Sequence, residues 1–285
     1  MPSPVAPLAG YTAADVAQLV GLSPARLRGL VRDGLLQPRC GRRGELRFSF
    51  QDLVLLRAAH GLLAAHLSPR RVHEALRRLR DQLPRGRSLA QVRIAAEGSR
   101  VVVRDGGEAW EPASGQALLD FEVRELVREA APLVQKQVAE ARRREAELDA
   151  DDWFDLGLDL EATDASEAVA AYRRTLALEP AHFDAHLNLG RLLHEAGDVA
   201  AAERHYRRAE ALRPDDATAA FNLGVALEDR RRLADAAAAY QRAIAADPRY
   251  ADAHFNLSGV LEKLGRKQAA LRHLKTYRQL VRGPR

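Results

Sequence analysis

The chain has 285 residues, enough for two or three domains, and its formal net charge is +5 at pH 7. It holds one cysteine, which excludes a disulfide framework, and no apolar run suits a signal peptide or a membrane span, so we expect a cytoplasmic protein. The charge is uneven, because residues 1–90 carry 15 arginines against six acids, whereas the rest carries 29 basic residues against 33 acids. A basic head on a mildly acidic body is typical of a nucleic-acid-binding domain joined to a protein-binding region.

The first predicted elements are two short helices joined by a tight turn. Thr12 is placed to cap the first helix, and Gly21 to end it. Ser23 is placed to cap the second helix, with Pro24 at its first position. The second helix is expected to bury three apolar residues, Leu27, Leu30 and Val31. This pattern predicts a helix-turn-helix domain over residues 1–87.

Residues 11–83 resemble the N-terminal domain of the MerR family of transcriptional regulators. The matching positions are Ala17, Leu19, Gly21, Leu22, Ser23, Leu27, Arg28 and Gly34-Leu35-Leu36, then an arginine-rich wing over 39–50, with Ser49, Asp52 and Leu53 opening a third helix. A fourth helix is expected over 68–83, capped by Ser68. The resemblance implies a winged helix-turn-helix that binds duplex DNA as a dimer. The chain departs from the family at Gly29-Leu30-Val31, where relatives place two aromatics and an acid, and at Gly44-Glu45-Leu46 in the wing.

Arginines are expected to supply the DNA contacts, since they neutralise phosphates and can read guanine edges. Arg28 and Arg32 share one helical face with Ala25, opposite the apolar face. Gly29 would allow either close approach to DNA or close packing on the first helix. The candidate DNA-binding residues are Thr12, Ser23, Arg26, Arg28, Arg32, Arg39, Arg42, Arg43 and Arg47.

The middle of the chain alternates like short strands and then becomes helical. Residues 88–117 predict a small β element, with turns near 97–99 and 105–107. A long helix is expected over 118–148, within a linking segment at 118–149. Its predicted apolar stripe consists of Val123, Val127, Ala130, Val134, Val138 and Ala141. Two interpretations stay open: a homodimer through this stripe, or a connecting helix packed on the first repeat.

The last half of the chain repeats itself every 34 residues. Pro180, Pro214 and Pro248 keep this step, as do three asparagines and three alanines. A fixed period of this length predicts a solenoid, because one unit cannot bury its apolar face alone. Residues 150–285 resemble tetratricopeptide repeats, with about four helix pairs. The matching positions of the second unit are Leu189, Gly190, Ala202, Tyr206, Ala209 and Pro214. The fold class is therefore mainly α: a winged helix-turn-helix, a small β-hairpin element with a long linking helix, and an α-solenoid.

One asparagine recurs in each of the last three repeats and predicts a peptide-binding column. Asn188, Asn222 and Asn256 occupy the same place on successive first helices, and an amide both donates and accepts hydrogen bonds. Such a column fits an extended protein segment, with Arg191, His186 and His254 as further groove residues. The alternative is that these asparagines stabilise each helix pair locally.

No motif in the sequence predicts catalysis, a cofactor or a metal site. Phosphate-binding loops, nucleophile elbows and His-Glu-x-x-His are missing, and His182 and His186 are expected to lie on a solvated helix. Cys40 in the wing is interpreted as a bystander. The leading hypothesis is a DNA-binding transcriptional regulator whose repeats bind protein. The alternative is a tetratricopeptide scaffold whose helix-turn-helix domain has degenerated and docks protein.

Overall fold

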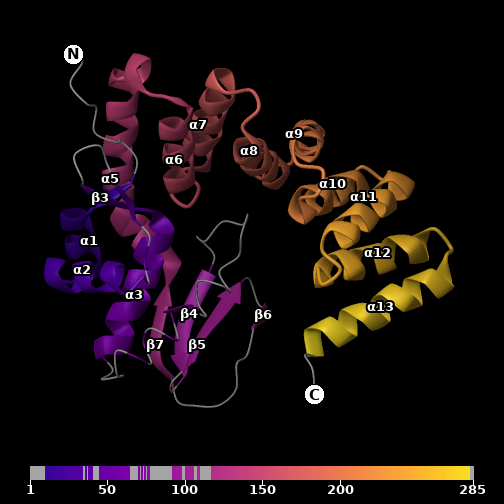
Figure 1. Cartoon of the computed structure of the whole chain (residues 1–285), viewed down its shortest axis with the longest axis horizontal. Helices are drawn as coiled ribbons and strands as arrows, with labels where there is room; N and C mark the ends of the chain where they lie inside the picture. The colour runs from indigo at the N-terminus through magenta and orange to yellow at the C-terminus, as the bar shows by residue number, and fades with distance from the viewer. Residues whose placement is uncertain are drawn as a thin grey trace. The chain divides into compact units, whose positions relative to one another are not determined.

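A computed structural model of the chain describes residues 10–34, 36, 38–40, 45–64, 70, 72, 74, 76, 77, 92–97, 100–105, 108–109 and 117–282. The chain is mainly helical and divides into two compact units, residues 1–174 and 175–285 (Figure 1). The first unit contains the helix-turn-helix, a four-stranded sheet and most of the first helix pair of the repeats. The second contains the three following helix pairs.

The helix-turn-helix forms where its caps predict it. The short strand β1 (Tyr11–Thr12) leads into α1 (Ala13–Val20), and α2 (Pro24–Arg32) follows. The Thr12 hydroxyl accepts a hydrogen bond from the Asp15 backbone at 3.1 Å, and the Asp15 carboxylate accepts one from the Thr12 backbone at 2.8 Å. Gly21 ends α1 at φ 76°, a left-handed conformation that favours glycine. Ser23 caps α2, with Pro24 at the first turn.

The wing is a small antiparallel sheet. Strands β2 (Arg39–Cys40) and β3 (Leu46–Phe48) pair, and β1 adds a third strand in the order β1-β3-β2. Helix α3 (Phe50–Ala64) begins after Ser49, whose hydroxyl accepts a hydrogen bond from the Asp52 backbone. Wing positions 41–44, which include Arg42 and Arg43, lie outside the described residues. The expected fourth helix is described only at 70, 72, 74, 76 and 77, which are helical.

The middle of the chain contains a larger sheet than we predicted. Strands β4 (Val92–Glu97), β5 (Arg100–Asp105) and β6 (Glu108–Ala109) match the predicted element. A fourth strand, β7 (Ala117–Glu122), pairs with β4, and the strand order is β6-β5-β4-β7. The prediction that a helix begins near residue 118 was therefore wrong. Pairing with β4 satisfies the backbone of 117–122, and this tertiary contact overrides its helical pattern.

The linking helix α5 (Val123–Arg143) is shorter than predicted and ends before a 3-10 turn, η2 (Glu145–Glu147). Its buried residues are Leu126, Ala130, Val134, Val138 and Ala141. This face packs inside the first unit, where α5 meets α1, α3 and α6. The stripe that suggested a homodimer is thus largely covered by the chain itself, as the alternative of a connecting helix requires.

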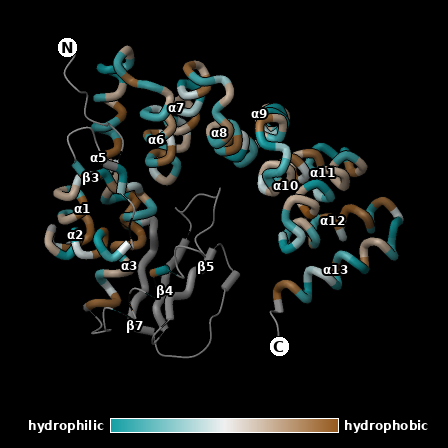
Figure 2. Tube along the Cα trace, viewed as in Figure 1, coloured by the Kyte–Doolittle hydropathy of each residue, from teal (hydrophilic) through white to brown (hydrophobic). Residues whose placement is uncertain are grey.

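Four helix pairs form the repeats. They are α6 (Ala150–Leu160) with α7 (Ala165–Leu178), α8 (Phe183–Glu195) with α9 (Val199–Leu212), α10 (Ala217–Asp229) with α11 (Leu233–Ala246), and α12 (Ala251–Lys263) with α13 (Lys267–Arg282). Each helix carries both hydrophilic and hydrophobic residues (Figure 2), as expected of amphipathic helices that bury one face.

A glycine–tyrosine contact fixes the spacing within the first three pairs. A Cβ atom on Gly157, Gly190 or Gly224 would lie 2.5–2.7 Å from the facing tyrosine ring. These rings belong to Tyr172, Tyr206 and Tyr240, all of which are almost fully buried. The last pair has Ser258 and Leu274 at these places. The tyrosine therefore fits only because the opposite helix has no side chain.

Candidate nucleic-acid interface and repeat face

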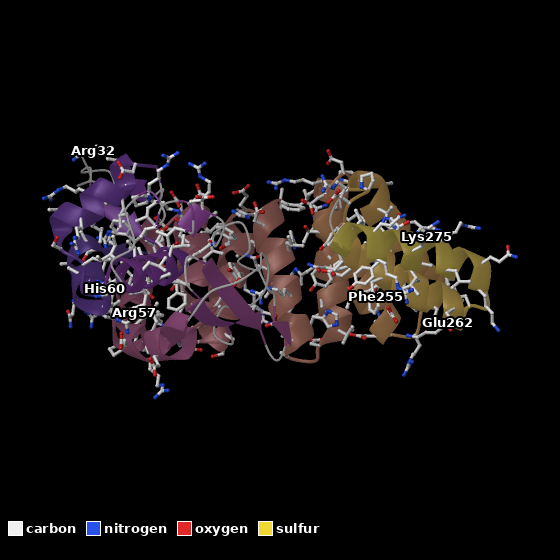
Figure 3. The ribbon with its side chains drawn as sticks, turned by 90° about the horizontal axis from the view of Figure 1, so that it is seen from below. Arg32, Arg57, His60, Phe255, Glu262 and Lys275 are labelled. Carbon is white, nitrogen blue, oxygen red and sulfur yellow. The ribbon has the colours of Figure 1, made fainter. Side chains whose placement is uncertain are left out.

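Helix α2 presents a basic outer face. Arg26, Arg28 and Arg32 are all exposed, and Arg32 is labelled in Figure 3. Leu27 is buried on the opposite side, whereas Leu30 and Val31 are only half-buried, less than we predicted. The helix therefore keeps its arginines in solvent while one leucine anchors it.

Gly29 lies on the same helix and has open space beside it. A Cβ atom added there would meet nothing within 4 Å. Close packing on α1 is therefore not the reason for this glycine. Close approach of DNA stays a prediction.

Two wing arginines already have partners within the chain. Arg39 forms an ion pair with Asp155 of α6, and its side chain remains 53% exposed. Arg47 is half-buried, and its Nη1 donates to the Gly10 carbonyl at 3.5 Å. Any DNA contact by these two arginines must therefore compete with an internal contact. Thr12 and Ser23, also predicted at the interface, use their hydroxyls as helix caps.

A buried carboxylate joins the first repeat to the helix-turn-helix domain. Asp159 on α6 is 3% exposed, and its two oxygens accept hydrogen bonds from the backbone of Gly10 at 2.6 Å and Phe50 at 3.3 Å. Burial raises the pKa of Asp159 to about 7, although both hydrogen bonds and the nearby Arg39 lower it. Gln137 of α5 donates to the Gly10 carbonyl at 3.0 Å. The start of β1 and the start of α3 are therefore both attached to α6.

Alignment of the first repeat with the later ones shows that Asp159 stands at an unusual place for an acid. Asp159 occupies the place that Leu192, Ala226 and Val260 occupy in the later repeats, and those three are buried. An acid at a buried apolar position requires a specific partner. The register was therefore a usable signal, but the Gly-to-Tyr step of the first unit is one residue short, which obscured it.

The asparagine column continues into the first repeat as an acid. Asp155 stands where Asn188, Asn222 and Asn256 stand in the later repeats, and Asp155 is the residue that holds Arg39. In the first repeat, this helix face thus already binds another part of the chain.

The three asparagines are not equivalent in their surroundings, although all are half-buried. The Asn256 amide donates to the Tyr240 hydroxyl at 3.4 Å, which links two neighbouring repeats. Asn188 also makes an interaction within the chain. The Asn222 side chain makes no hydrogen bond with the part of the chain that the structure describes. The local role that we kept as an alternative therefore applies to Asn256, and Asn222 is the best placed to meet a partner.

The other predicted groove residues are buried. Arg191 is 6% exposed and forms an ion pair with Glu195 at 2.9 Å. His186 and His254 are 9% and 6% exposed. Each of the three thus fills the interior of its own helix pair, and direct contact with a partner stays a prediction.

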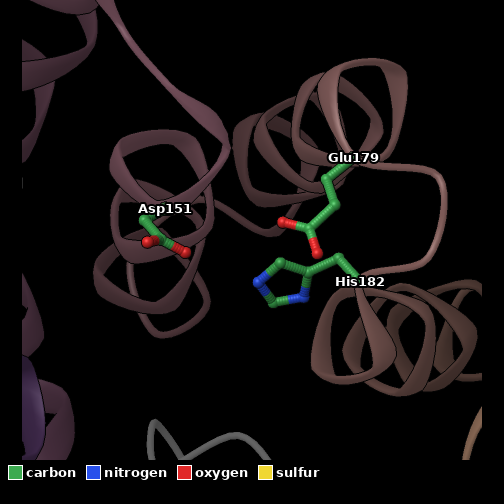
Figure 4. Close-up of side chains that lie close together, drawn as sticks. All are labelled: Asp151, Glu179 and His182. Atoms are coloured by element: carbon green, nitrogen blue, oxygen red, sulfur yellow. The ribbon is translucent and has the colours of Figure 1, made fainter.

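Two potential metal ligands lie at the turn before α8 (Figure 4). Glu179 and His182 place ligand atoms within 4.8 Å of one another. His182 caps α8, and its Nδ1 accepts a hydrogen bond from the Ala185 backbone at 3.1 Å. One ring nitrogen is therefore already used for structure, and we assign no metal to this turn.

Two family models match the chain. Residues 11–79 match the MerR HTH family of regulatory proteins, and three overlapping stretches, 158–217, 195–250 and 221–283, match the tetratricopeptide repeat. No curated protein matches the chain. None of the helices in the described ranges is long and apolar enough to cross a membrane.

Solved structures of MamA proteins are similar to a little over half of the chain. "MamA RS-1 ArsTM double mutant" is 25% identical over 55% of this chain and 85% of its own, with a TM-score of 0.49. "MamA 41-end from Desulfovibrio magneticus RS-1" is 25% identical over 56% of this chain and 88% of its own, also with a TM-score of 0.49. "Crystal structure of MamA" is 18% identical over 56% and 91%, with the same TM-score.

Proposed function

We propose that this chain, which joins a MerR-type helix-turn-helix domain to tetratricopeptide repeats, is a DNA-binding transcriptional regulator whose repeats bind a protein segment. One observation carries the DNA half of the proposal: Arg26, Arg28 and Arg32 are exposed together on a capped second helix. A second helix of this type lies in the major groove, where its first turns reach base edges. The proposal includes no catalytic step and no cofactor, and it places the protein in the cytoplasm.

DNA binding is tested with the full chain, because Asp159 ties the helix-turn-helix domain to α6. Fluorescence anisotropy with random genomic duplexes at several salt concentrations measures affinity and its salt dependence. Arg28→Ala should weaken binding by about 1–3 kcal/mol and flatten the salt slope by about one unit if it contacts a phosphate.

Arg278→Ala is the matched control, since Arg278 is an exposed arginine on α13. It removes the same charge and should leave DNA affinity unchanged. Equal losses in both variants would mean that binding follows net charge alone, and the docked-helix proposal would be abandoned.

The protein-binding half of the proposal rests on the position shared by Asp155 and the asparagines. In the first repeat this position engages an arginine from another element. We infer that Asn222 does the same for an extended segment of a partner, because an amide can both donate to and accept from a peptide backbone. Each such hydrogen bond contributes about 0.5–1.5 kcal/mol.

A partner captured with the full chain gives the test. Asn222→Ala should weaken its binding several-fold while the melting temperature stays nearly constant. Asn256→Ala is the comparison variant, because it also removes the hydrogen bond to Tyr240 and should lower stability. Loss of stability without loss of affinity in Asn222→Ala would reduce the column to a structural feature.

A scaffold function is the second candidate, and the ion pair between Arg39 and Asp155 favours it. Here a wing arginine pairs with a carboxylate of its own chain, which supports a wing that contacts protein. No DNA binding at low salt would select this function. A homodimer stays a prediction. The apolar stripe of α5 no longer supports it, because most of that stripe is buried within the chain. Sedimentation of the full chain with and without DNA would decide it.

A further inference from the structure

Two pairs of histidines join the helices of the second and fourth repeats. In the second repeat, Nδ1 of His186 on α8 lies 2.9 Å from Nδ1 of His205 on α9. In the fourth, Nδ1 of His254 on α12 lies 3.0 Å from Nδ1 of His273 on α13. The two pairs are 68 residues apart, which is twice the repeat period. The same contact therefore occurs at equivalent places in two repeats.

A proline carbonyl sets the tautomer of the first histidine in each pair. Nε2 of His186 lies 3.1 Å from the Pro180 carbonyl, and Nε2 of His254 lies 3.2 Å from the Pro248 carbonyl. A carbonyl can only accept, so Nε2 must carry the proton. Nδ1 of the same ring then presents a lone pair, and the second histidine of the pair must donate to it.

The rings face each other head-on. In both pairs the ring centroids are 5.2 Å apart, which is the nitrogen–nitrogen distance plus about half a ring on each side. The two nitrogens therefore point at each other. A metal ion shared by two imidazoles lies about 2.0–2.1 Å from each nitrogen, at a point where both lone pairs converge. The observed geometry fits a shared proton better than a metal.

We propose that each histidine pair resists protonation, so that acid loosens the second and fourth repeats. A first added proton can enter only at Nε2 of the second histidine, which is half-buried in both pairs. It keeps the hydrogen bond between the rings but places a charge in a partly desolvated site. A second proton must occupy Nδ1 of the first histidine, which breaks this bond and brings two cations into contact.

The surroundings favour the neutral form. Burial lowers the pKa of His186 most, the hydrogen bond to the Pro180 carbonyl raises it, and the charges of Arg208 and His182 lower it. Burial also lowers the pKa of His273, followed by the charges of His254 and Arg272. The charged groups that shift the pKa values of His186 and His273 are thus all basic.

The neighbouring helices bring apolar groups to these repeats. Helix α10 contributes Ala219 to the cluster with Phe183 of α8, and α11 contributes Ala243 to the cluster with Ala253 of α12. A folded-state pKa below the ordinary histidine value means that the unfolded chain binds more protons as the pH falls through about 6.5. Stability should therefore fall on acidification below that pH.

The third repeat shows which substitution the fold accepts. Ala220 and Ala239 stand at the two histidine positions there, and both are buried. The double variants His186→Ala/His205→Ala and His254→Ala/His273→Ala therefore copy a pair that the same solenoid already contains. The control is His182→Asn, which changes a neighbouring histidine outside the pairs and keeps a helix-capping side chain.

Thermal unfolding of the full chain between pH 7.5 and 5.5 tests the proposal. The melting temperature of the repeats should fall by several degrees in the parent chain and in His182→Asn. Each double variant should remove about half of this fall, and the quadruple variant nearly all of it. Nitrogen-15 NMR of the imidazoles at pH 7.5 should show His186 and His254 protonated at Nε2 only.

Three results would overturn the proposal. The first is an unchanged pH dependence in the quadruple variant. The second is NMR titration of the paired imidazoles as independent groups. The third is uptake of one Zn²⁺ per pair that is lost in the double variants, which would make the pairs metal sites.

Discussion

The first repeat and the three that follow share one architecture but differ at two equivalent positions. The first has acids at both, Asp155 and Asp159, whereas the later repeats have asparagine at one and a buried apolar residue at the other. Both acids of the first repeat contact the helix-turn-helix domain. The first repeat therefore differs from the later ones at two side chains, and both of them bind it to the rest of its own unit.

The comparison separates what holds the repeat together from what makes it specific. Gly157 and Tyr172 keep the same contact as their counterparts in the second and third repeats, so helix pairing does not depend on the acids. Asp155 and Asp159 instead determine what α6 contacts outside its own repeat. Asp155 pairs with Arg39, and Asp159 accepts hydrogen bonds from the backbone of Gly10 and Phe50.

The largest effect is expected from giving the first repeat the apolar residue of the second. Asp159→Leu leaves the backbone N–H groups of Gly10 and Phe50 without their acceptor. Each buried unsatisfied group costs about 1–3 kcal/mol, so the first unit should lose about 2–6 kcal/mol. Urea unfolding followed by tryptophan fluorescence, to which Trp153 on α6 contributes, measures the loss. Unchanged stability would show that the carboxylate is dispensable and that apolar packing alone joins α6 to the domain.

The pH dependence of this contact is the next largest effect. Folding raises the pKa of Asp159 from 3.8 to about 7, so the folded chain keeps a proton that the unfolded chain has released. Its contribution is thus fully present below about pH 4 and is lost as the pH rises through about 7, by up to about 4 kcal/mol. Asp159→Asn cannot titrate, and its urea midpoint should fall less between pH 5 and pH 8 than that of the parent chain. Parallel pH profiles for the two proteins would contradict the raised pKa.

Much of this architecture could be predicted from local sequence. The caps at Thr12 and Ser23 and the 34-residue period reflect rules that act within one turn or one repeat, and the helices follow them. The fourth strand, β7, could not be predicted this way, because its pairing with β4 depends on residues about 25 positions earlier.

The candidate site was less predictable than the fold. Arg26, Arg28 and Arg32 are exposed as the helix pattern implies. In contrast, Arg39 looked like any wing arginine until its partner on α6 was known. A charge pattern predicts that an arginine will contact an anion. It does not predict whether that anion is a DNA phosphate or the carboxylate of Asp155. The burial of Arg191 was missed for the same reason, since its place in the interior follows from packing.

The shared glycine–tyrosine contact should behave alike in the first repeat and the later ones. In Gly157→Ala and Gly224→Ala the new methyl group would overlap a tyrosine ring, and each should destabilise its own unit by about 1–3 kcal/mol. Gly259 on α12 is the matched control, because a Cβ atom there meets nothing within 4 Å. Gly259→Ala should be neutral or stabilising by up to about 1 kcal/mol. A loss in only one of the first two variants would mean that the repeats are not built alike.

The smallest effect on stability is expected from giving the first repeat the asparagine of the others. Asp155→Asn removes the ion pair with Arg39, whose side chain is 53% exposed, so the change in stability should be under about 1 kcal/mol. DNA affinity is the informative measurement. If Arg39 contacts a phosphate, losing its internal competitor should raise affinity about two- to fivefold, equivalent to about 0.4–1 kcal/mol.

The same change in an Arg39→Gln background separates this effect from the loss of one negative charge. Direct competition predicts that Asp155→Asn has no effect on DNA affinity once the arginine is gone, since the two residues act on each other. An equal rise in DNA affinity in both backgrounds would mean that Asp155 repels DNA at a distance. This rise should then become smaller as salt is added. If Asp155→Asn leaves affinity unchanged in both backgrounds, Arg39 belongs to the contact with α6, and DNA recognition is left to the arginines of α2 and the rest of the wing.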